Sequence, residues 1–234
     1  DVYSTIDIRM QDIAQTALLR SLEKYQAESG SVILMDVKTG AIRAMSSLQR
    51  TEKEKYAENF NYAFGAAYEP GSTFKLASLL VVLEDGKVDT ATIVDTKNGV
   101  FKFYDKTMKD SNSHRGGHGK ISLGRAFEVS SNIGIARTIV DIYEDKPQEF
   151  IDRLARLGVS NKLDFELLGE AEPWIKNRSD KTWSGVSLPW ISYGYELEMS
   201  ALQILALYNG VANNGELVKP YLVDRIQLGE HLLN

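Results

Sequence analysis

The sequence contains no cysteine, which excludes disulfide bonds, thiol catalysis and zinc–thiolate sites. It has no run of about 18 apolar residues, so no segment is apolar over the length of a membrane-spanning helix. It also lacks an excess of positive charge, because 27 Lys and Arg stand against 32 Asp and Glu, giving a formal net charge of −5. Binding to nucleic-acid backbones through a basic surface is therefore not expected.

The composition is that of a globular protein. Of 234 residues, 43% are hydrophobic and 25% are charged, which is enough apolar material for a sizeable core. No internal repeat or Ser/Gly linker divides the sequence, so we predict one domain, residues 1–234. The opening "DVYSTID" has neither an initiator methionine nor a signal peptide. We therefore expect a fragment of a longer protein whose membrane anchor lies upstream.

Apolar residues at helical spacing, with capping residues and glycines at the ends, predict six helices. The first opens at Ser4, Thr5 or Asp7 and is stopped by Gly30. The others lie within residues 72–86, on both sides of an interruption in residues 121–143, within 146–158, and within 198–215.

Alternating and β-rich runs predict strands between these helices. Val32–Val37 and Ala41–Ser46 form a hairpin about Lys38-Thr39-Gly40, and strand-like fragments lie within residues 91–105. Residues 49–60 are polar, which favours a solvated loop or surface helix, and residues 109–120 have the composition of a flexible loop. Together with the helices, these strands predict a mixed α/β fold.

The stretch "EPGSTFK", residues 69–75, poses a chemical question. Lys75 stands three residues after Ser72, at the start of a helix that is apolar nearly all round and should be buried. A buried lysine is unfavourable unless something uses it. Because burial lowers its pKa, the amine can take the proton of the Ser72 hydroxyl and make it a nucleophile. The structural alternative is that Ser72 caps the helix and Lys75 extends to solvent.

A second motif, Ser130-Ser131-Asn132, interrupts the helical pattern of residues 121–143. A serine hydroxyl there can relay a proton to a leaving amine, and an asparagine amide can hold a peptide backbone. Alone, the motif is explained equally well as a turn that caps the second helix. Ser-x-x-Lys followed by Ser-x-Asn, however, matches the pair found in penicillin-binding proteins and serine β-lactamases.

The segments around both motifs, "NYAFGAAYEPGSTFKLASLLVVLEDG" and "GRAFEVSSNIGIARTI", resemble the transpeptidase domain of class B (monofunctional) penicillin-binding proteins of the septal, cell-division type. The opening "TIDIRMQDIAQTAL", the hairpin "ILMDVKTGAIRAMSS" and the segment "ISYGYELEMSALQILALYNGVANNGELVKPYLV" resemble the same family. The resemblance implies an antiparallel sheet flanked by helices, similar to serine β-lactamases.

The resemblance also implies a role for each motif residue. Ser72 would be the acylated nucleophile, Lys75 its general base, Ser130 the proton shuttle to the departing D-alanine, and Asn132 the residue that orients the donor peptide. The substrate would be the D-Ala-D-Ala end of peptidoglycan stem peptides, and β-lactams would acylate Ser72. No metal or organic cofactor is implied. The location would be the periplasmic face of the inner membrane, with cell-division membrane proteins as partners.

The family's third motif, Lys-(Thr/Ser)-Gly, does not follow Asn132 in this sequence. Lys38-Thr39-Gly40 is not assigned to that role, because it precedes the nucleophile and is ordinary turn chemistry. The resemblance therefore implies a domain that lacks C-terminal strands and has low or no activity. A sheet without those strands would also have an open edge.

Other functions are compatible with parts of this pattern. A β-lactamase or a penicillin sensor would have the same fold, and a non-catalytic division scaffold would need no intact motifs. His114 and His118 have a metal-like spacing, but they lie in a glycine-rich stretch with no third ligand in view, so a zinc site is not expected.

Overall fold

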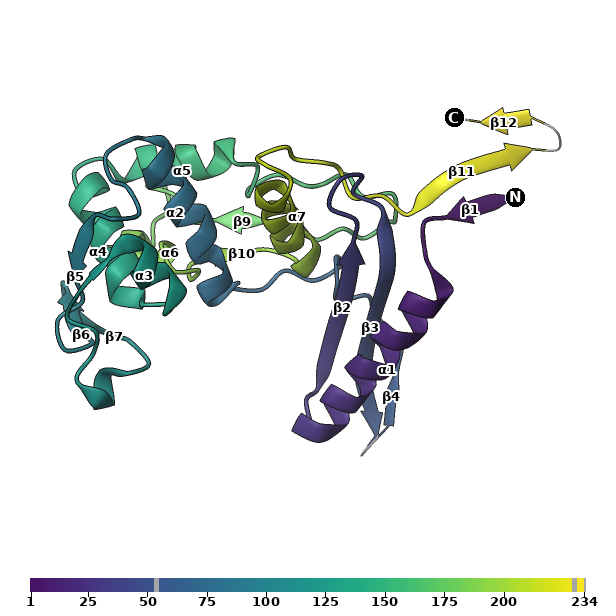
Figure 1. Ribbon diagram of the computed structural model, residues 1–234, viewed down its shortest axis with the longest axis horizontal. Coiled ribbons are helices and arrows are strands. Elements are labelled where there is room, and N and C mark those ends of the chain that lie inside the picture. Colours follow the sequence, from purple (N-terminus) through teal and green to yellow (C-terminus); the bar gives the residue numbers. More distant parts are fainter. Residues whose placement is uncertain (53–54, 229–230, 234) are drawn as a thin grey trace. The chain divides into compact units, whose positions relative to one another are not determined.

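The computed structural model describes residues 1–52, 55–228 and 231–233 (Figure 1). Contacts divide the chain into two compact units. The first comprises Asp1–Ala67, Lys162–Glu172 and Met199–Asn234, and the second comprises Tyr68–Asn161 and Pro173–Glu198. Both contain helices and antiparallel strand pairs, which confirms the predicted mixed α/β class.

The first unit is built on a long antiparallel hairpin, with helix α1 packed against it (Figure 1). Its elements are β1 (Val2–Ser4), α1 (Ile8–Tyr25), β2 (Ser29–Met35), β3 (Ile42–Glu52), β4 (Lys55–Ala57), α7 (Ala201–Ala212), β11 (Val223–Leu228) and β12 (His231–Leu233). The strand orders are β2-β3-β4 and β1-β11-β12. A hydrophobic core that includes Ile42, Phe64 and Leu202 fills this unit.

The ends of α1 show what the sequence predicted and what it did not. Asp7 caps the helix, as expected, because its carboxylate accepts the N–H groups of Arg9 and Met10. The helix ends at Tyr25, however, and the predicted stop at Gly30 is wrong, because Gly30 lies inside β2. Gln26 ends the helix instead, in the left-handed conformation at φ 51°.

The predicted loop or surface helix at residues 49–60 is also wrong in part. Strand β3 continues to Glu52 and β4 pairs with it, while residues 53 and 54 lie outside the described residues. Charged side chains are compatible with this short strand pair because they are exposed, and Lys55 forms an ion pair with Glu52 at 2.8 Å. Polar composition alone did not distinguish a solvated strand from a loop.

The Lys38-Thr39-Gly40 sequence forms the turn between β2 and β3. One carboxylate oxygen of Asp36 accepts the N–H groups of Lys38 and Thr39, at 3.1 and 2.9 Å, and the Thr39 hydroxyl at 2.8 Å. Gly40 has a φ of +80°, which favours glycine. These contacts confirm the structural interpretation of the triplet.

The second unit is built around the apolar helix α2. Its elements are the 3₁₀ helix η1 (Gly71–Phe74), α2 (Lys75–Glu84), β5 (Ile93–Asp95), β6 (Val100–Phe103), β7 (Lys106–Lys109), η2 (Ser113–Arg115), β8 (Lys120–Ser122), α3 (Leu123–Glu128), α4 (Asn132–Tyr143), α5 (Pro147–Arg156), β9 (Trp174–Ile175), α6 (Ser187–Ile191) and β10 (Leu197–Glu198). The strands pair antiparallel as β5–β8, β6–β7 and β9–β10. Helices α3, α4 and α5 contact α2.

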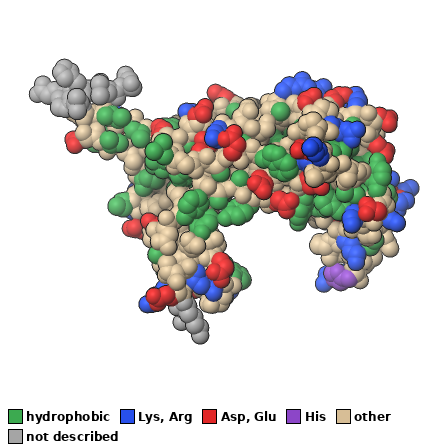
Figure 2. Space-filling view, turned by 180° about the vertical axis from the view of Figure 1, so that it is seen from behind, with side chains coloured by type: hydrophobic (Ala, Val, Ile, Leu, Met, Phe, Trp, Pro, Cys, Tyr) green, Lys and Arg blue, Asp and Glu red, His purple; other side chains and the backbone are tan. Residues whose placement is uncertain are grey.

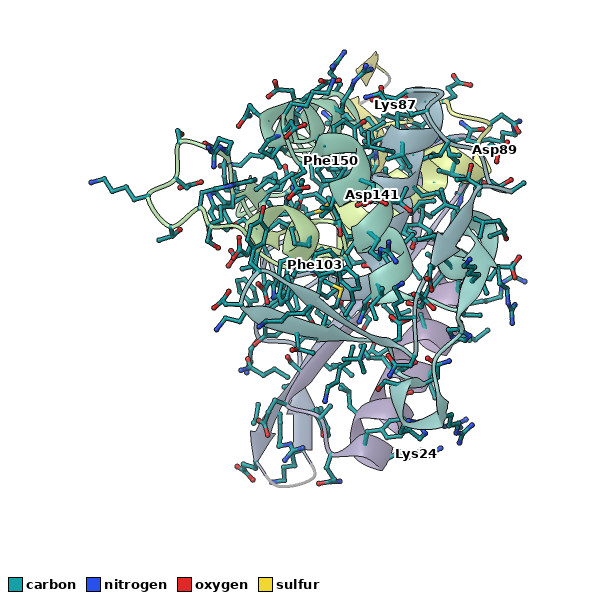
Figure 3. The ribbon with its side chains drawn as sticks, turned by 90° about the vertical axis from the view of Figure 1, so that its left-hand side faces the viewer. Lys24, Lys87, Asp89, Phe103, Asp141 and Phe150 are labelled. Carbon is teal, nitrogen blue, oxygen red and sulfur yellow. The ribbon has the colours of Figure 1, made fainter. Side chains whose placement is uncertain are left out.

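The core of this unit fixes the β6–β7 hairpin against α4. Phe103 and Met108 of the hairpin pack with Ile133 and Ala136 of α4, and all four are buried. Figure 3 shows Phe103 and, on α5, Phe150 among closely packed side chains. The position of β7 relative to the start of α4 is therefore set by apolar packing.

The surface and the helices add two observations. On the face seen in Figure 2, lysine and arginine side chains are interspersed with aspartate, glutamate and hydrophobic side chains. Among the described residues, no helix combines the length and the apolarity needed to cross a bilayer.

Candidate active site

Ser72 lies exposed on η1, directly after the Pro70-Gly71 turn. The turn is held by a close backbone approach, in which the Gly71 N–H donates to the carbonyl of Gly194 at 3.0 Å. Gly194 has a φ of +96°, and a Cβ at this position would stand 2.0 Å from the Gly71 carbonyl oxygen. Only glycine fits there, so the meeting of two glycines sets the position of the Ser72 backbone.

Lys75, the first residue of α2, is only 1% exposed, and its ammonium group has three acceptors. It donates to the Ser130 carbonyl at 2.6 Å, to the Ser130 hydroxyl at 2.9 Å and to Oδ1 of Asn132 at 2.7 Å. The alternative in which Lys75 extends to solvent is therefore wrong. Three of the four predicted site residues come together, although Ser130 and Asn132 lie 55 and 57 residues from Lys75 in sequence.

Ser72 stands one turn before Lys75, and its backbone carbonyl accepts the Lys75 N–H. Neither η1 nor α2 has a side-chain cap, so Ser72 is not the capping residue of the alternative interpretation. Its hydroxyl forms no hydrogen bond with another residue that the structure describes. The serine is thus exposed, one turn before the buried lysine that begins α2.

The environment of Lys75 changes its proton affinity. Burial lowers the pKa of Lys75 to about 8, and the negative charge of Asp110 partly opposes this effect. An amine with this pKa is neutral in an appreciable fraction of molecules near neutral pH. It can therefore accept a proton, which an ordinary surface lysine does rarely.

The three residues of the Ser130–Asn132 turn have different roles. Ser131 caps α4, because its hydroxyl oxygen accepts the Gly134 N–H at 2.9 Å. Ser130 is exposed and has a φ of +54°, which is uncommon for a residue other than glycine. Asn132 donates its side-chain amide to the Lys109 carbonyl at 2.9 Å. The capping alternative is thus correct for Ser131, and it leaves Ser130 and Asn132 facing Lys75.

Asp110, a buried carboxylate beside this turn, was not among the predicted site residues. Asp110 is 3% exposed and accepts the Ser131 hydroxyl at 2.7 Å. It falls in the stretch expected to be a flexible loop because of its glycines. A signal was present, since Met108 and Asp110 stand two residues apart at the end of β7 and both point inward.

An ion pair between a buried lysine and a partly exposed glutamate is connected to the nucleophile turn. Lys176, 7% exposed, lies 2.9 Å from a carboxylate oxygen of Glu196, which joins the ends of β9 and β10. The Glu196 N–H in turn donates to Glu69 at 3.0 Å, just before Pro70. The Ser78 hydroxyl donates to the Ser192 carbonyl at 2.7 Å. Residues 192–196 therefore hold both the turn and helix α2.

No group of three or more His, Asp or Glu side chains placed to hold a metal ion exists among the residues described. His114 lies in η2, where its Nε2 accepts a hydrogen bond from the Arg115 side chain at 3.1 Å. The arrangement around Ser72 and Lys75 has the groups for acyl transfer through a serine ester.

Comparison with known proteins agrees with this chemistry. Residues 30–231 match the family model described as "Penicillin binding protein transpeptidase domain". The chain is 29% identical over 223 residues to the "Probable peptidoglycan D,D-transpeptidase PbpC" of Pseudomonas aeruginosa, covering 93% of this chain and 38% of that protein. It is 24% identical over 230 residues to the peptidoglycan D,D-transpeptidase FtsI of Escherichia coli, covering 95% of this chain and 37% of that protein.

Solved structures show the same fold. The TP domain of penicillin-binding protein 3 from Burkholderia pseudomallei has a TM-score of 0.79 and 25% identity, covering 98% of this chain and 63% of that one. A peptidoglycan glycosyltransferase from Burkholderia ambifaria has a TM-score of 0.81 and 24% identity, covering 99% of this chain and 67% of that one. This chain thus spans about two fifths of the length of the curated relatives, and about two thirds of the solved chains.

Proposed function

The chain belongs to the penicillin-binding protein transpeptidase domain family, and from this premise we propose that it carries the acyl-transfer site of a serine D,D-transpeptidase. One observation supports the assignment above the others. A buried lysine of lowered pKa stands one turn after an exposed serine and contacts the Ser-x-Asn motif. Family membership alone would not require this geometry to be intact.

The first step forms an ester on Ser72. Neutral Lys75 accepts the Ser72 proton while the serine oxygen attacks the carbonyl carbon of the penultimate D-alanine. The carbon–nitrogen bond breaks, and the departing D-alanine amine receives a proton from the Ser130 hydroxyl. Lys75 then returns a proton to Ser130, along the 2.9 Å contact between them. Asn132 orients the donor peptide through its side-chain amide.

The second step transfers the acyl group. An amine of a neighbouring stem peptide attacks the ester carbonyl and gives up a proton to neutral Lys75. The Ser72 oxygen then leaves and takes that proton from Lys75. The product is a peptidoglycan cross-link. A β-lactam mimics the D-Ala-D-Ala end, so its ring opens onto Ser72 in the first step.

The setting of this reaction also belongs to the proposal. Likeness to FtsI supports the septal, cell-division type, acting at the periplasmic face of the inner membrane with division membrane proteins as partners. A membrane anchor would lie in a part of the protein outside this sequence.

The test is covalent labelling. The chain is incubated with a penicillin, and intact-mass and peptide mass spectrometry look for an adduct on Ser72. Ser72→Ala is the variant that must stay unlabelled, and Thr73→Ala, the neighbouring exposed hydroxyl, is the matched control that must label. Labelling elsewhere, or equal labelling of Ser72→Ala, would reject the assignment of the nucleophile.

The pH dependence of labelling tests the base. Only neutral Lys75 can take the proton, so the acylation rate should rise with pH up to about 8 and then level off. Lys75→Arg introduces a side chain that does not lose its proton in this pH range, so this variant should abolish the reaction. A rate that is flat between pH 6 and 9 would contradict the role of Lys75.

A further inference from the structure

Asp110 is a buried acidic side chain that is not part of a salt bridge with any described residue. At 3% exposure, it forms no ion pair with any lysine or arginine in the described ranges. Its two carboxylate oxygens are used separately: one accepts the Ser131 hydroxyl at 2.7 Å, and the other accepts the Ile133 N–H at 3.0 Å. A buried carboxylate is strongly unfavourable unless such bonds compensate its lost hydration.

The start of α4 supplies the rest of the compensation. Ser131 is the N-cap of this 12-residue helix and Ile133 is its second residue, so the carboxylate sits at the positive end of the helix dipole. The Asp110 carboxylate in turn fixes the residue at which α4 begins. Met108, packed with Ile133 in the core, holds the strand that delivers Asp110.

The residues between and beside these two bonds are the ones that face Lys75. Asn132 lies between the anchored Ser131 and Ile133, and its Oδ1 accepts from Lys75. Ser130 precedes them with its unfavourable φ of +54°, and both its oxygens accept from Lys75. A backbone conformation of this kind persists only where the surroundings enforce it.

We propose that Asp110 is the positioning residue of this site: its two hydrogen bonds hold the Ser130–Asn132 turn in the conformation that engages Lys75. The inference rests on the proposed function for its catalytic meaning. Asp110 has no contact with Ser72 and acts through Ser131 and Ile133. It belongs to neither of the two sequence motifs.

The negative charge of Asp110 also acts on the Lys75 amine. Asp110 raises the pKa of Lys75 against the larger, opposite effect of burial. The other groups facing the amine, Ser130 and Asn132, are neutral, and the Lys109 side chain next to Asp110 is exposed. Loss of Asp110 therefore has two separable results, a displaced turn and a lower pKa of Lys75.

The first measurement needs no turnover. Lysine ¹³Cε signals are titrated by NMR in the wild type and in Asp110→Asn, with the Lys75 signal identified by its loss in Lys75→Arg. We expect the pKa of Lys75 to fall in Asp110→Asn and the amide signals of Ile133 and Gly134 to shift. Asp105→Asn, an exposed aspartate at the tip of the same hairpin, is the matched control and should change neither.

The second measurement is the rate of acylation by a fluorescent penicillin between pH 6 and 9. In Asp110→Asn the plateau should drop by about tenfold or more, because misplacement of a catalytic group by about 1 Å costs up to about 10² in rate. The midpoint of the pH profile should move to lower pH. Ser131→Ala removes one of the two bonds, together with the Ser131 cap of α4, without changing the charge. Its plateau should therefore drop while its midpoint stays.

The outcomes distinguish failure of the positioning role of Asp110 from failure of the proposed function. An unchanged Lys75 titration together with unchanged Ile133 and Gly134 signals in Asp110→Asn overturns the positioning role, whether or not the protein is acylated. Full acylation by Ser131→Ala also overturns it, and this variant decides the matter should Asp110→Asn fail to fold. Absence of acylation in the wild type rejects the proposed function alone, since the NMR shifts would still support the role of Asp110 in ordering the turn.

Discussion

The contact between Gly71 and Gly194 makes a quantitative prediction about Gly194→Ala. A residue other than glycine in the left-handed region costs roughly 1–2 kcal/mol, and Gly194 has a φ of +96°. The new Cβ would also stand 2.0 Å from the Gly71 carbonyl oxygen, where real contacts stay above 3.0 Å. Forced repacking of this kind costs about 1–3 kcal/mol, so we expect a total loss of about 2–5 kcal/mol in the free energy of unfolding.

The matched control is Gly86→Ala. Gly86 also has a positive φ, +65°, but a Cβ at this position would have no atom within 4 Å, so only the backbone strain of about 1–2 kcal/mol applies. The difference between the two variants isolates the close approach. Urea denaturation monitored by circular dichroism measures both free energies.

Acylation should separate the variants more sharply than stability. Gly194→Ala must push Gly71 aside and with it the Ser72 backbone, so labelling by penicillin should fall by about 10² or more. Gly86→Ala, at the far end of α2, should label at the wild-type rate. If Gly194→Ala were no less stable than Gly86→Ala and labelled as fast, the account of the nucleophile turn would be refuted.

Three further predictions concern the same unit. Ser72→Ala should change the free energy of unfolding by less than about 0.5 kcal/mol, measured by urea denaturation, because the side chain is exposed. Burial lowers the pKa of Lys75 from 10.5 to about 8, so between these pH values the unfolded state binds more protons and the free energy of unfolding rises with pH. Urea denaturation should therefore show that the stability of the wild type relative to Lys75→Met increases between pH 7 and pH 10. An unchanged difference would contradict the burial of Lys75. Glu196→Gln leaves Lys176 buried beside a neutral group and should cost about 3 kcal/mol in thermal unfolding, whereas Glu198→Gln, an exposed neighbour, should be neutral.

Local patterns in the sequence predicted those parts of the site that depend on neighbouring residues. The apolar run after Lys75 placed this lysine in a buried helix, and the structure has it 1% exposed. The paired helices on either side of Ser130-Ser131-Asn132 were predicted equally well, because capping residues act within one turn of themselves.

Contacts between distant residues were beyond such patterns. Nothing near Lys75 indicates that Ser130 and Asn132 will contact it, and only the resemblance to a family joined the motifs. Asp110 was missed because composition averages over a stretch, and the glycines at 116, 117 and 119 outweighed one inward-facing acid. The end of α1 at Gln26 was missed since a left-handed residue other than glycine leaves little trace in sequence.

The division of the chain into two units has a consequence for how the protein is made. The site-bearing unit ends at Glu198, and only Lys162–Glu172 interrupts it, whereas the other unit contains both β1 and the strand β11 that pairs with it. During synthesis from the N-terminus, residues 68–198 leave the ribosome before β11 exists. The second unit is thus free to fold while β1 is still unpaired. The candidate active site is assembled before β1 and β11, which flank it in sequence, pair with each other.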